Sequence, residues 1–312
     1  MASAKARKKA DENKSSLSSI AQTRGDKVFD IFVNIFLLLA ALITIYPIYF
    51  VLLASISSPA AIASGRTFLL PSEPSLAPYK HIMGDARIWR GYANTIFYTL
   101  SGTILGLLLT IPSGYALSRK DLVGNGIIMK LMVFTMYFSG GLVPTYMVIK
   151  NLNMVDSPSV MIILGSFTVY NLIVTRTFFM SKIPDEMLEA SQIDGCGNFR
   201  FFTSIVLPLS KEIVAVMVLY IAVYHWNAFF NAMIYLQTQK RYPLQLILRE
   251  ILVGSQSVMT DSVSSSDIGE MQRLAETIKY GVMIVSSVPI LILYPFVQRY
   301  FVRGVMLGSI KG

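Results

Sequence analysis

The chain has 312 residues, of which 54% are apolar and only 14% are charged. A soluble domain of this length needs more charge to cover its surface, so the composition favours a protein embedded in lipid. The net charge of +9 is explained by basic membrane loops, since no nucleic-acid motif accompanies it. The single cysteine, Cys196, excludes an internal disulfide.

Residues 1–27 form a polar, basic tail before the first apolar run. This run is too long for the core of a signal peptide and lacks a small-residue cleavage site, so we interpret it as a retained first span. A membrane-spanning helix needs about 20 apolar residues. Six windows without Asp, Glu, Lys or Arg meet this requirement, namely Ile31–Ala54, Asn94–Leu117, Leu131–Ile149, Ser157–Thr175, Ile213–Leu236 and Tyr280–Val297.

Most Lys and Arg residues lie in the N-terminal tail, in the second and fourth connecting segments and after the sixth window. The positive-inside rule therefore places the N- and C-termini in the cytoplasm. The sequence predicts an all-α integral membrane protein with six transmembrane helices, which form one domain over residues 28–312. The segments 57–91 and 237–279 are then external loops, and the segment 181–212 is cytoplasmic.

The two external loops differ in character. In the loop 57–91 we expect a short helix after the turn-rich stretch Leu70–Pro74. The loop 237–279 contains an apolar run, Pro243–Leu252, which is too short to span a membrane. The polar stretch that follows, Ser255–Ser266, is typical of flexible chain.

The cytoplasmic segment 181–212 has the pattern of a helix, a break and a second helix. Pro184 suits a helix start, Gly195 suits the break, and the second helix runs from about Asn198 toward Pro208. An ordinary connector is the simplest interpretation. The length of the segment and the acidic residues of its first helix instead favour a folded projection that docks on a partner.

The same segment resembles the EAA motif of binding-protein-dependent ABC importer permeases. That motif is E-A-A, three residues, G, nine residues, I, one residue and L-P, and every spacing matches. The matching residues are Glu189, Ala190, Ser191, Gly195, Ile205, Leu207 and Pro208. Only Ser191 departs, since it replaces the second alanine by another small residue. Asp194 immediately precedes the glycine.

Other segments resemble the carbohydrate branch of that family, closest to its oligosaccharide and polysaccharide-fragment importers and related to the second permease of the maltose system. These segments are Phe138–Tyr146, Trp226–Phe230, Tyr242–Gln245 and Gly308–Gly312. The resemblance implies a type I ABC importer permease fold in a bacterial cytoplasmic (inner) membrane. It also implies that the chain forms half of a path for a carbohydrate. The implied partners are a second homologous permease, two ATPase subunits and an external or periplasmic sugar-binding protein.

The resemblance further implies that the cytoplasmic segment is a coupling helix, which sits in a cleft of the ATPase. Glu189 would face a basic residue of the ATPase and Gly195 would make the turn. Ala190 and Ser191 would allow close backbone approach. ATP and Mg would bind to the ATPase, so no cofactor is expected in this chain, which also lacks a phosphate-binding G-x-x-x-x-G-K-[ST] loop.

Two other functions stay open on the residues alone. A stand-alone secondary transporter would be expected to carry an acidic or paired ionisable group within its spans, and none of the six windows has one. A membrane-anchored scaffold would use the cytoplasmic loop without transporting anything. An enzyme is not indicated, because the two histidines, His81 and His225, belong to no catalytic or metal-binding motif.

Polar side chains recur at helical spacing in three of the windows. Hydrogen bonding between helices is one explanation. A shared polar path for a sugar is another, because sugar hydroxyls bind amides and sugar C–H faces pack on aromatic rings. Trp226 is a further candidate contact, whereas His225 lies off the stripe and is interpreted as packed. The candidate path residues are Asn94, Tyr98, Ser101, Thr168, Asn171, Thr175, Tyr220, Tyr224, Asn227 and Asn231. The sequence leaves open whether the sugar is neutral or anionic.

Overall fold

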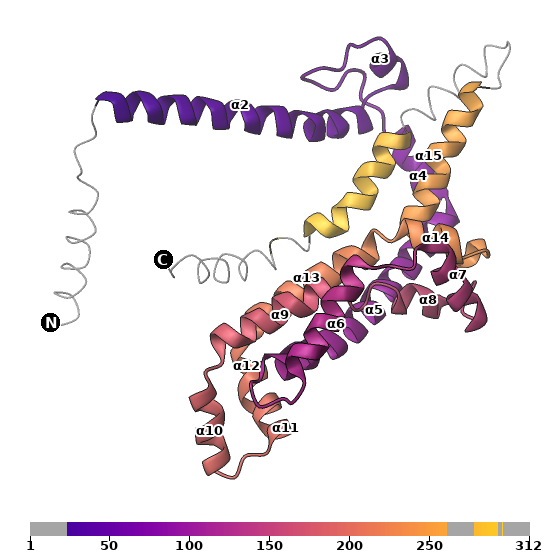
Figure 1. Ribbon diagram of the computed structural model, residues 1–312. Helices are drawn as coiled ribbons and strands as arrows, with labels where there is room; N and C mark the ends of the chain where they lie inside the picture. Colours follow the sequence, from indigo (N-terminus) through magenta and orange to yellow (C-terminus); the bar gives the residue numbers. More distant parts are fainter. Residues whose placement is uncertain (1–23, 261–277, 293–294, 296–312) are drawn as a thin grey trace.

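The computed structural model describes residues 24–260, 278–292 and 295, and their regular secondary structure is helical throughout (Figure 1). The helices, including a π-helix (η1) and a 3-10 helix (η2), are α2 Arg24–Ser55, α3 Pro59–Ala63, α4 Ala77–Gly84, α5 Ala86–Ser118, α6 Asn125–Tyr137, α7 Leu142–Asn151, α8 Pro158–Ile163, α9 Val169–Lys182, α10 Asp185–Ile193, α11 Asn198–Phe201, η1 Phe202–Val206, α12 Leu207–Leu209, α13 Lys211–Trp226, α14 Phe229–Tyr235, η2 Gln239–Arg241 and α15 Leu244–Thr260. A further apolar helix covers Ile278–Ile292.

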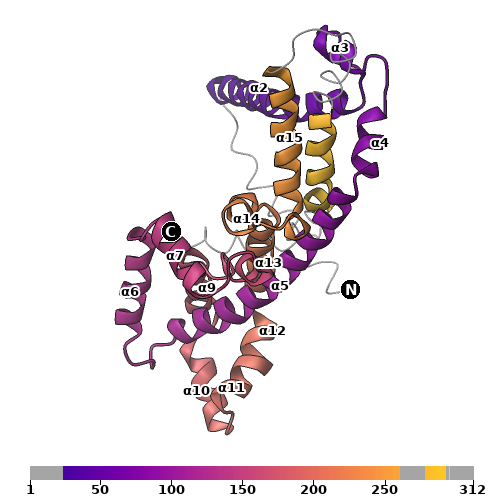
Figure 2. The same ribbon diagram turned by 90° about the vertical axis from the view of Figure 1, so that its right-hand side faces the viewer.

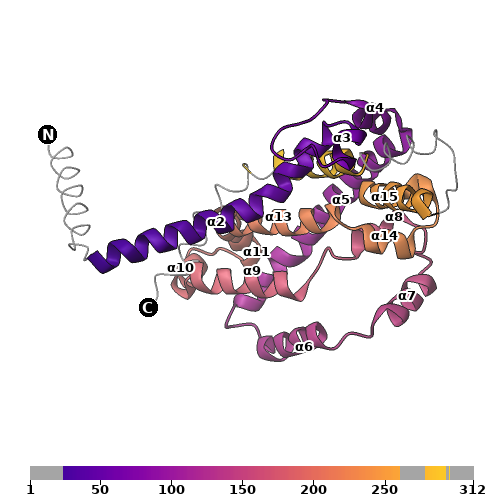
Figure 3. The same ribbon diagram turned by 90° about the horizontal axis from the view of Figure 1, so that it is seen from above.

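Helix α5 lies at the centre of the bundle. The Asp85 carboxylate caps its N-terminus by accepting the Arg87 backbone N–H at 2.8 Å. α5 packs along its length against α9 and α13, and it also contacts α15, α8 and α4. Seen from above, α6 and α7 lie along one edge of this bundle (Figure 3).

Glycines on α5 allow its neighbours to approach closely. A Cβ atom at Gly106 would lie 2.5 Å from the Ser166 carbonyl oxygen and 2.8 Å from Ile221 Cδ1. The space where a Cβ atom would lie is occupied in the same way by the His225 ring at Gly102 and by Thr175 at Gly114. Small residues at such positions are typical of helix packing in membranes, where dispersion contacts replace the hydrophobic effect.

Helix α2 extends away from the bundle, and its contact with the other described helices lies near its C-terminal end (Figure 1). There the Tyr79 hydroxyl donates to Ser55 Oγ at 2.9 Å, and the Phe50 ring meets Tyr280 edge-on. Most other apolar side chains of α2 are exposed, which is expected of a helix that lipid or another membrane protein covers. The exceptions are Leu53 and Ala54, which are buried, and Val33 and Val51, which are half-buried.

The prediction of six continuous spans is not confirmed. By length and composition, α2 and α5 can each cross a membrane, and up to four spans exist among the described residues if two bent helix pairs each count as one. The third window is one of these pairs, because α6 and α7 meet at 111°. The other pair is Asn198–Leu209 with α13, bent by 80°.

The fourth and fifth windows are also interrupted, which corrects the expectation of unbroken helices. Between α8 and α9, Gly165 adopts a φ of +86° and Thr168 caps the next helix. Between α13 and α14 the chain turns at Asn227 and Ala228. Packed neighbours can satisfy irregular backbone of this kind, so apolar composition alone does not enforce a continuous helix.

The short helix expected in the loop 57–91 is confirmed as α4, although α5 already begins at Ala86. The first residues of Ser255–Ser266 belong to α15, up to Thr260, and so are helical rather than irregular. The rest of that stretch lies outside the described residues. So do most of the basic tail, the last residues of the sixth window and the segment Gly308–Gly312.

Candidate functional site

The segment 181–212 folds as predicted into two helices, α10 and α11, that project from one end of the molecule, opposite α3 and α4 (Figure 2). Pro184 directly precedes α10, and Asp185 and Glu186 lie in its first turn, where the helix dipole favours negative charge. The second helix continues from α11 through the π-helix η1 into α12, so it ends near Pro208, as expected.

The break between the helices is a Schellman motif. The Cys196 N–H donates to the Ser191 carbonyl at 2.9 Å, and the Gly195 N–H donates to the Gln192 carbonyl at 3.0 Å. Gly195 has a φ of +74°, a conformation that favours glycine. A Cβ atom at Gly195 would meet nothing within 4 Å, so the surface around the turn is open.

The apolar half of the motif anchors the loop. Phe201 and Val206 are buried, and Ile205 and Leu207 pack against the same cluster, which contains Tyr115. Membership of this cluster ties α11, η1 and α12 to α5, α9 and α13. A movement of the loop would therefore be passed to these helices.

The other half of the motif is exposed. Glu189, Ala190 and Asp194 lie on the surface, whereas Ser191 is buried and donates to the Leu188 carbonyl at 2.7 Å. Asp194 is also the C-cap residue of α10.

Two residues near the tip, which sequence reasoning missed, are apolar and almost fully exposed. They are Ile193, at 87%, and Phe199, at 81%. Large apolar side chains exposed on a largely polar projection are typical of a surface that binds a protein or a membrane. Apolar residues flanking the glycine break were the signal available in the sequence.

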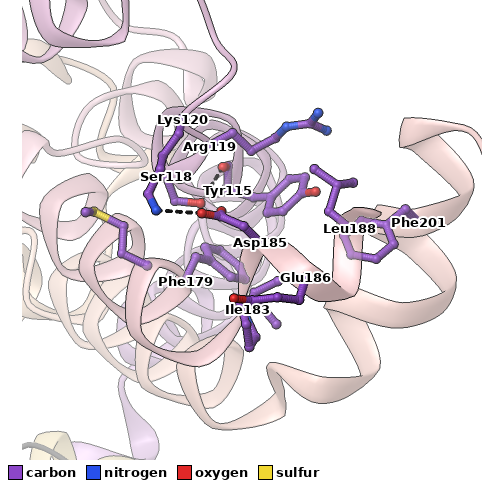
Figure 4. A pocket seen from close by; sticks show the side chains of 12 residues that line it. Tyr115, Ser118, Arg119, Lys120, Phe179, Ile183, Asp185, Glu186, Leu188 and Phe201 are labelled. Atoms are coloured by element: carbon purple, nitrogen blue, oxygen red, sulfur yellow. Dashed lines mark hydrogen bonds and ion pairs between the residues drawn. The ribbon is translucent and has the colours of Figure 1, made fainter. Parts of the chain in front are cut away.

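A pocket of about 230 Å³ lies at the base of the loop, between the end of α5, α9, α10 and α11 (Figure 4). Across it, Lys120 Nζ pairs with Asp185 Oδ2 at 2.5 Å. Arg119 Nη1 donates to Asn198 Oδ1 at 2.9 Å, and Arg176 Nε donates to the Leu117 carbonyl. The C-terminus of α5 is thus linked by polar contacts to α9, α10 and α11.

These links predict that reversing one charge lowers saccharide uptake more than it lowers the stability of the fold. In a Lys120→Asp variant, two carboxylates face each other, and uptake is expected to fall several-fold while the unfolding temperature changes little, because exposed ion pairs contribute little to stability. The double variant Lys120→Asp/Asp185→Lys should recover uptake. Transport and ATP hydrolysis by the assembled complex are the measurements, and failure of the double variant to recover contradicts the proposed link.

Four candidate path residues lie together at the junction of α13 and α14. Tyr220, Tyr224 and Asn227 are exposed, and Asn231 is half-buried. Asn231 Nδ2 donates to the Tyr224 hydroxyl at 3.1 Å, so the two residues face the same side although the helix is broken between them. We call Tyr220, Tyr224, Asn227 and Asn231 the α13–α14 face.

Two candidate path residues of the second apolar window, Asn94 and Tyr98, instead bind the backbone of a distant segment of the chain. Asn94 Nδ2 donates to the Lys240 and Tyr242 carbonyls, both at 2.9 Å, and the Tyr98 hydroxyl donates to the Arg241 carbonyl at 2.9 Å. Ser101 is half-buried. Hydrogen bonding within the protein therefore accounts for Asn94 and Tyr98.

Packing also accounts for the remaining candidates. Trp226 is buried and its Nε1 donates to the Ser286 carbonyl at 3.2 Å. Thr168 caps α9 by accepting the Asn171 N–H, and Asn171 and Thr175 are buried. His225 is packed, as expected, against Ser166 and Gly102. The three stripes do not meet in one open interior of this chain, and a role in the path stays a prediction.

A polar cluster around Asp156 fixes the loop between α14 and α15. Asp156 Oδ1 accepts the Gln237 and Thr238 backbone N–H groups at 3.0 and 2.9 Å, and Oδ2 accepts the Thr238 hydroxyl at 2.6 Å. Arg241 Nη1 lies 3.1 Å from Oδ2. The Thr238 hydroxyl hydrogen bond and then the backbone N–H groups lower the pKa of Asp156 to about 2.

This pKa predicts a defined pH dependence. A carboxyl with a lowered folded-state pKa stabilises the fold above its unfolded value of 3.8 and loses that effect as the pH falls toward about 2. Asp156→Asn should lower the unfolding temperature in detergent at pH 7, by a difference from wild type that shrinks below pH 4. A difference that stays constant between pH 7 and pH 3 contradicts the role of this carboxylate.

Comparison with known proteins identifies the family, although no family model matches the chain. The polygalacturonan/rhamnogalacturonan transport system permease protein YtcP of Bacillus subtilis is 37% identical over 290 residues, which are 92% of this chain and 99% of that protein. The chain belongs to the permease family of sugar ABC importers. The Bacillus subtilis protein LplC is 32% identical to this permease over 296 residues, which cover 95% of the permease and 99% of LplC.

The fold of the permease agrees with this assignment. The crystal structure of a bacterial ABC transporter involved in the import of the acidic polysaccharide alginate contains a chain that matches with a TM-score of 0.79 and 32% identity. The match covers 90% of the permease and 99% of that chain. The expected family, a sugar-import function and a membrane location are confirmed, whereas a stand-alone secondary transporter is not supported. The roles of individual motif residues are not tested by these comparisons.

Proposed function

We propose that the permease forms half of a transmembrane path for an oligosaccharide or polysaccharide fragment in a bacterial cytoplasmic membrane. Six spans with both termini in the cytoplasm place the α10–α11 projection inside the cell, and the basic residues of the sequence support this orientation. The projection carries the proposal, because it combines the EAA spacing with the exposed Glu189, Ile193 and Phe199.

A separate ATPase supplies the energy. ATP-driven closure of two ATPase subunits moves the α10–α11 loop, and the apolar anchor around Phe201 and Val206 passes the movement to α5, α9 and α13. ATP and Mg are bound by the ATPase and not by this chain, which has no phosphate-binding loop motif.

The path itself needs a second, homologous permease. The α13–α14 face offers two tyrosines and two amides to one side of the molecule, and a second chain facing it would close the path. An external sugar-binding protein delivers the saccharide. The exposed length of α2 is available to lipid or to the second permease. Two of the similar proteins bear names that refer to polygalacturonan and to acidic alginate, which are polymers containing uronic acids.

Co-purification tests this proposal. The tagged permease is extracted from its native membrane in mild detergent, and the proteins that accompany it are identified and quantified. An ATPase subunit and a second permease in stoichiometric amounts are the expected result. A permease that emerges alone, and takes up saccharide under an ion gradient in proteoliposomes, contradicts the proposal.

A further inference from the structure

Helix α15 carries two neighbouring charges that point to different sides. Arg249 and Glu250 are separated by about 100° around the helix, so they do not face each other. The Arg249 guanidinium carbon lies 5.7 Å from the centre of the Phe229 ring, and the guanidinium also contacts the Met233 sulfur. Among the ion pairs of the described residues, none involves Arg249.

Arg249 lines a cavity of about 280 Å³ between α14, α15 and the helix Ile278–Ile292. Most of the other lining side chains are apolar, including Leu248 and Val282. Arg249 is exposed where it lines this cavity, so its guanidinium is accessible to a solute that enters. The cavity thus presents a cation, beside apolar side chains, to a negative group.

The cavity adjoins the α13–α14 face. Gln245, one turn before Arg249, also lines the cavity, and its Nε2 donates to Asn227 Oδ1 at 3.4 Å. The exposed ring of Phe230 lies next to Phe229. Two amides, an aromatic ring and a cation therefore occur side by side at one end of the face.

We propose that this cavity is a subsite for an acidic saccharide, in which Arg249 pairs with the carboxylate of a uronic acid unit. The planar guanidinium matches a carboxylate in two parallel hydrogen bonds, and the ring of Phe229 holds it in place by a cation–π contact. Asn227 and Gln245 bind sugar hydroxyls. The inference rests on the proposed function and adds the charge of the substrate to it.

The test compares a galacturonic acid trisaccharide with its fully methyl-esterified form, in which each carboxylate is replaced by a neutral ester. Uptake of each saccharide is measured in proteoliposomes that contain the complete importer and its binding protein. Each uptake rate is divided by the fraction of binding protein that carries that saccharide. In the Arg249→Gln variant, uptake of the acid is expected to fall about tenfold relative to uptake of the ester. Arg249→Lys should retain part of the uptake, and Glu250→Gln, on another side of α15, should behave as wild type.

Two sets of outcomes overturn the inference while leaving the proposed function intact. One is an equal loss for acid and ester in Arg249→Gln, which would assign the residue to folding, to a lipid headgroup or to docking of the binding protein. The other is undiminished uptake of both saccharides by Arg249→Gln, or a wild-type importer that takes up only the ester. A wild-type importer that takes up neither saccharide belongs to this second set, whereas a permease that emerges alone on co-purification contradicts the proposed function itself.

Discussion

Replacing Gly195 by aspartate is expected to reduce saccharide uptake to background while the permease still inserts into the membrane. The left-handed φ of +74° costs a non-glycine residue about 1–2 kcal/mol, which a folded membrane protein can tolerate. The open space around the turn excludes a clash within this chain. Under the proposed function the loss arises where the ATPase docks on the loop, and Glu189→Lys should have the same effect through its reversed charge. Uptake and the ATP hydrolysis of the assembled complex are the measurements.

Gly124 provides a matched control. It also adopts a left-handed φ, of +82°, and also has open space around its Cβ position, but it lies between α5 and α6, outside the loop. Gly124→Asp should carry the same backbone strain and keep uptake near the wild-type level. Normal uptake by Gly195→Asp, or equal losses in both variants, contradicts the coupling role of the α10–α11 loop.

Replacing Gly106 by alanine is expected to destabilise the permease by about 3 kcal/mol. The added Cβ atom would lie 2.5 Å from a backbone oxygen, that of Ser166, which cannot rotate away as a side chain can. Helix α5 must then move away from α13 and from the chain between α8 and α9. The unfolding temperature in detergent and the amount of protein in the membrane are the measurements.

Gly126→Ala, in α6, is the control for this substitution. Gly126 is also helical, but its Cβ position meets nothing within 4 Å. Alanine there should leave stability unchanged or raise it slightly, because alanine is the better helix former. A Gly106→Ala variant as stable as Gly126→Ala would show that α5 is less tightly packed than its contacts indicate.

The sequence by itself determined the features that depend on local order and composition. Apolar windows without charge predicted a helical membrane protein, and the spacing from Glu189 to Pro208 predicted the family that the comparisons then confirmed. Gly195 could be assigned to the break because the Schellman motif depends on neighbouring residues alone. Such local patterns survive in any tertiary context.

Only the tertiary structure decided what the polar residues do. Asn94 and Tyr98 recur on α5 at the same helical spacing as the residues of the α13–α14 face, and Trp226 lies on α13 itself. All three nevertheless donate to backbone carbonyls far away in the chain, at 240–242 and 286. Spacing along a helix shows which side chains share a face, but the partner of that face is set by packing. Packing likewise decided where the apolar windows are broken and placed Arg249 beside Phe229. Hydrophobicity determines whether a segment lies in lipid or in water, whereas long-range contacts determine the course of its backbone.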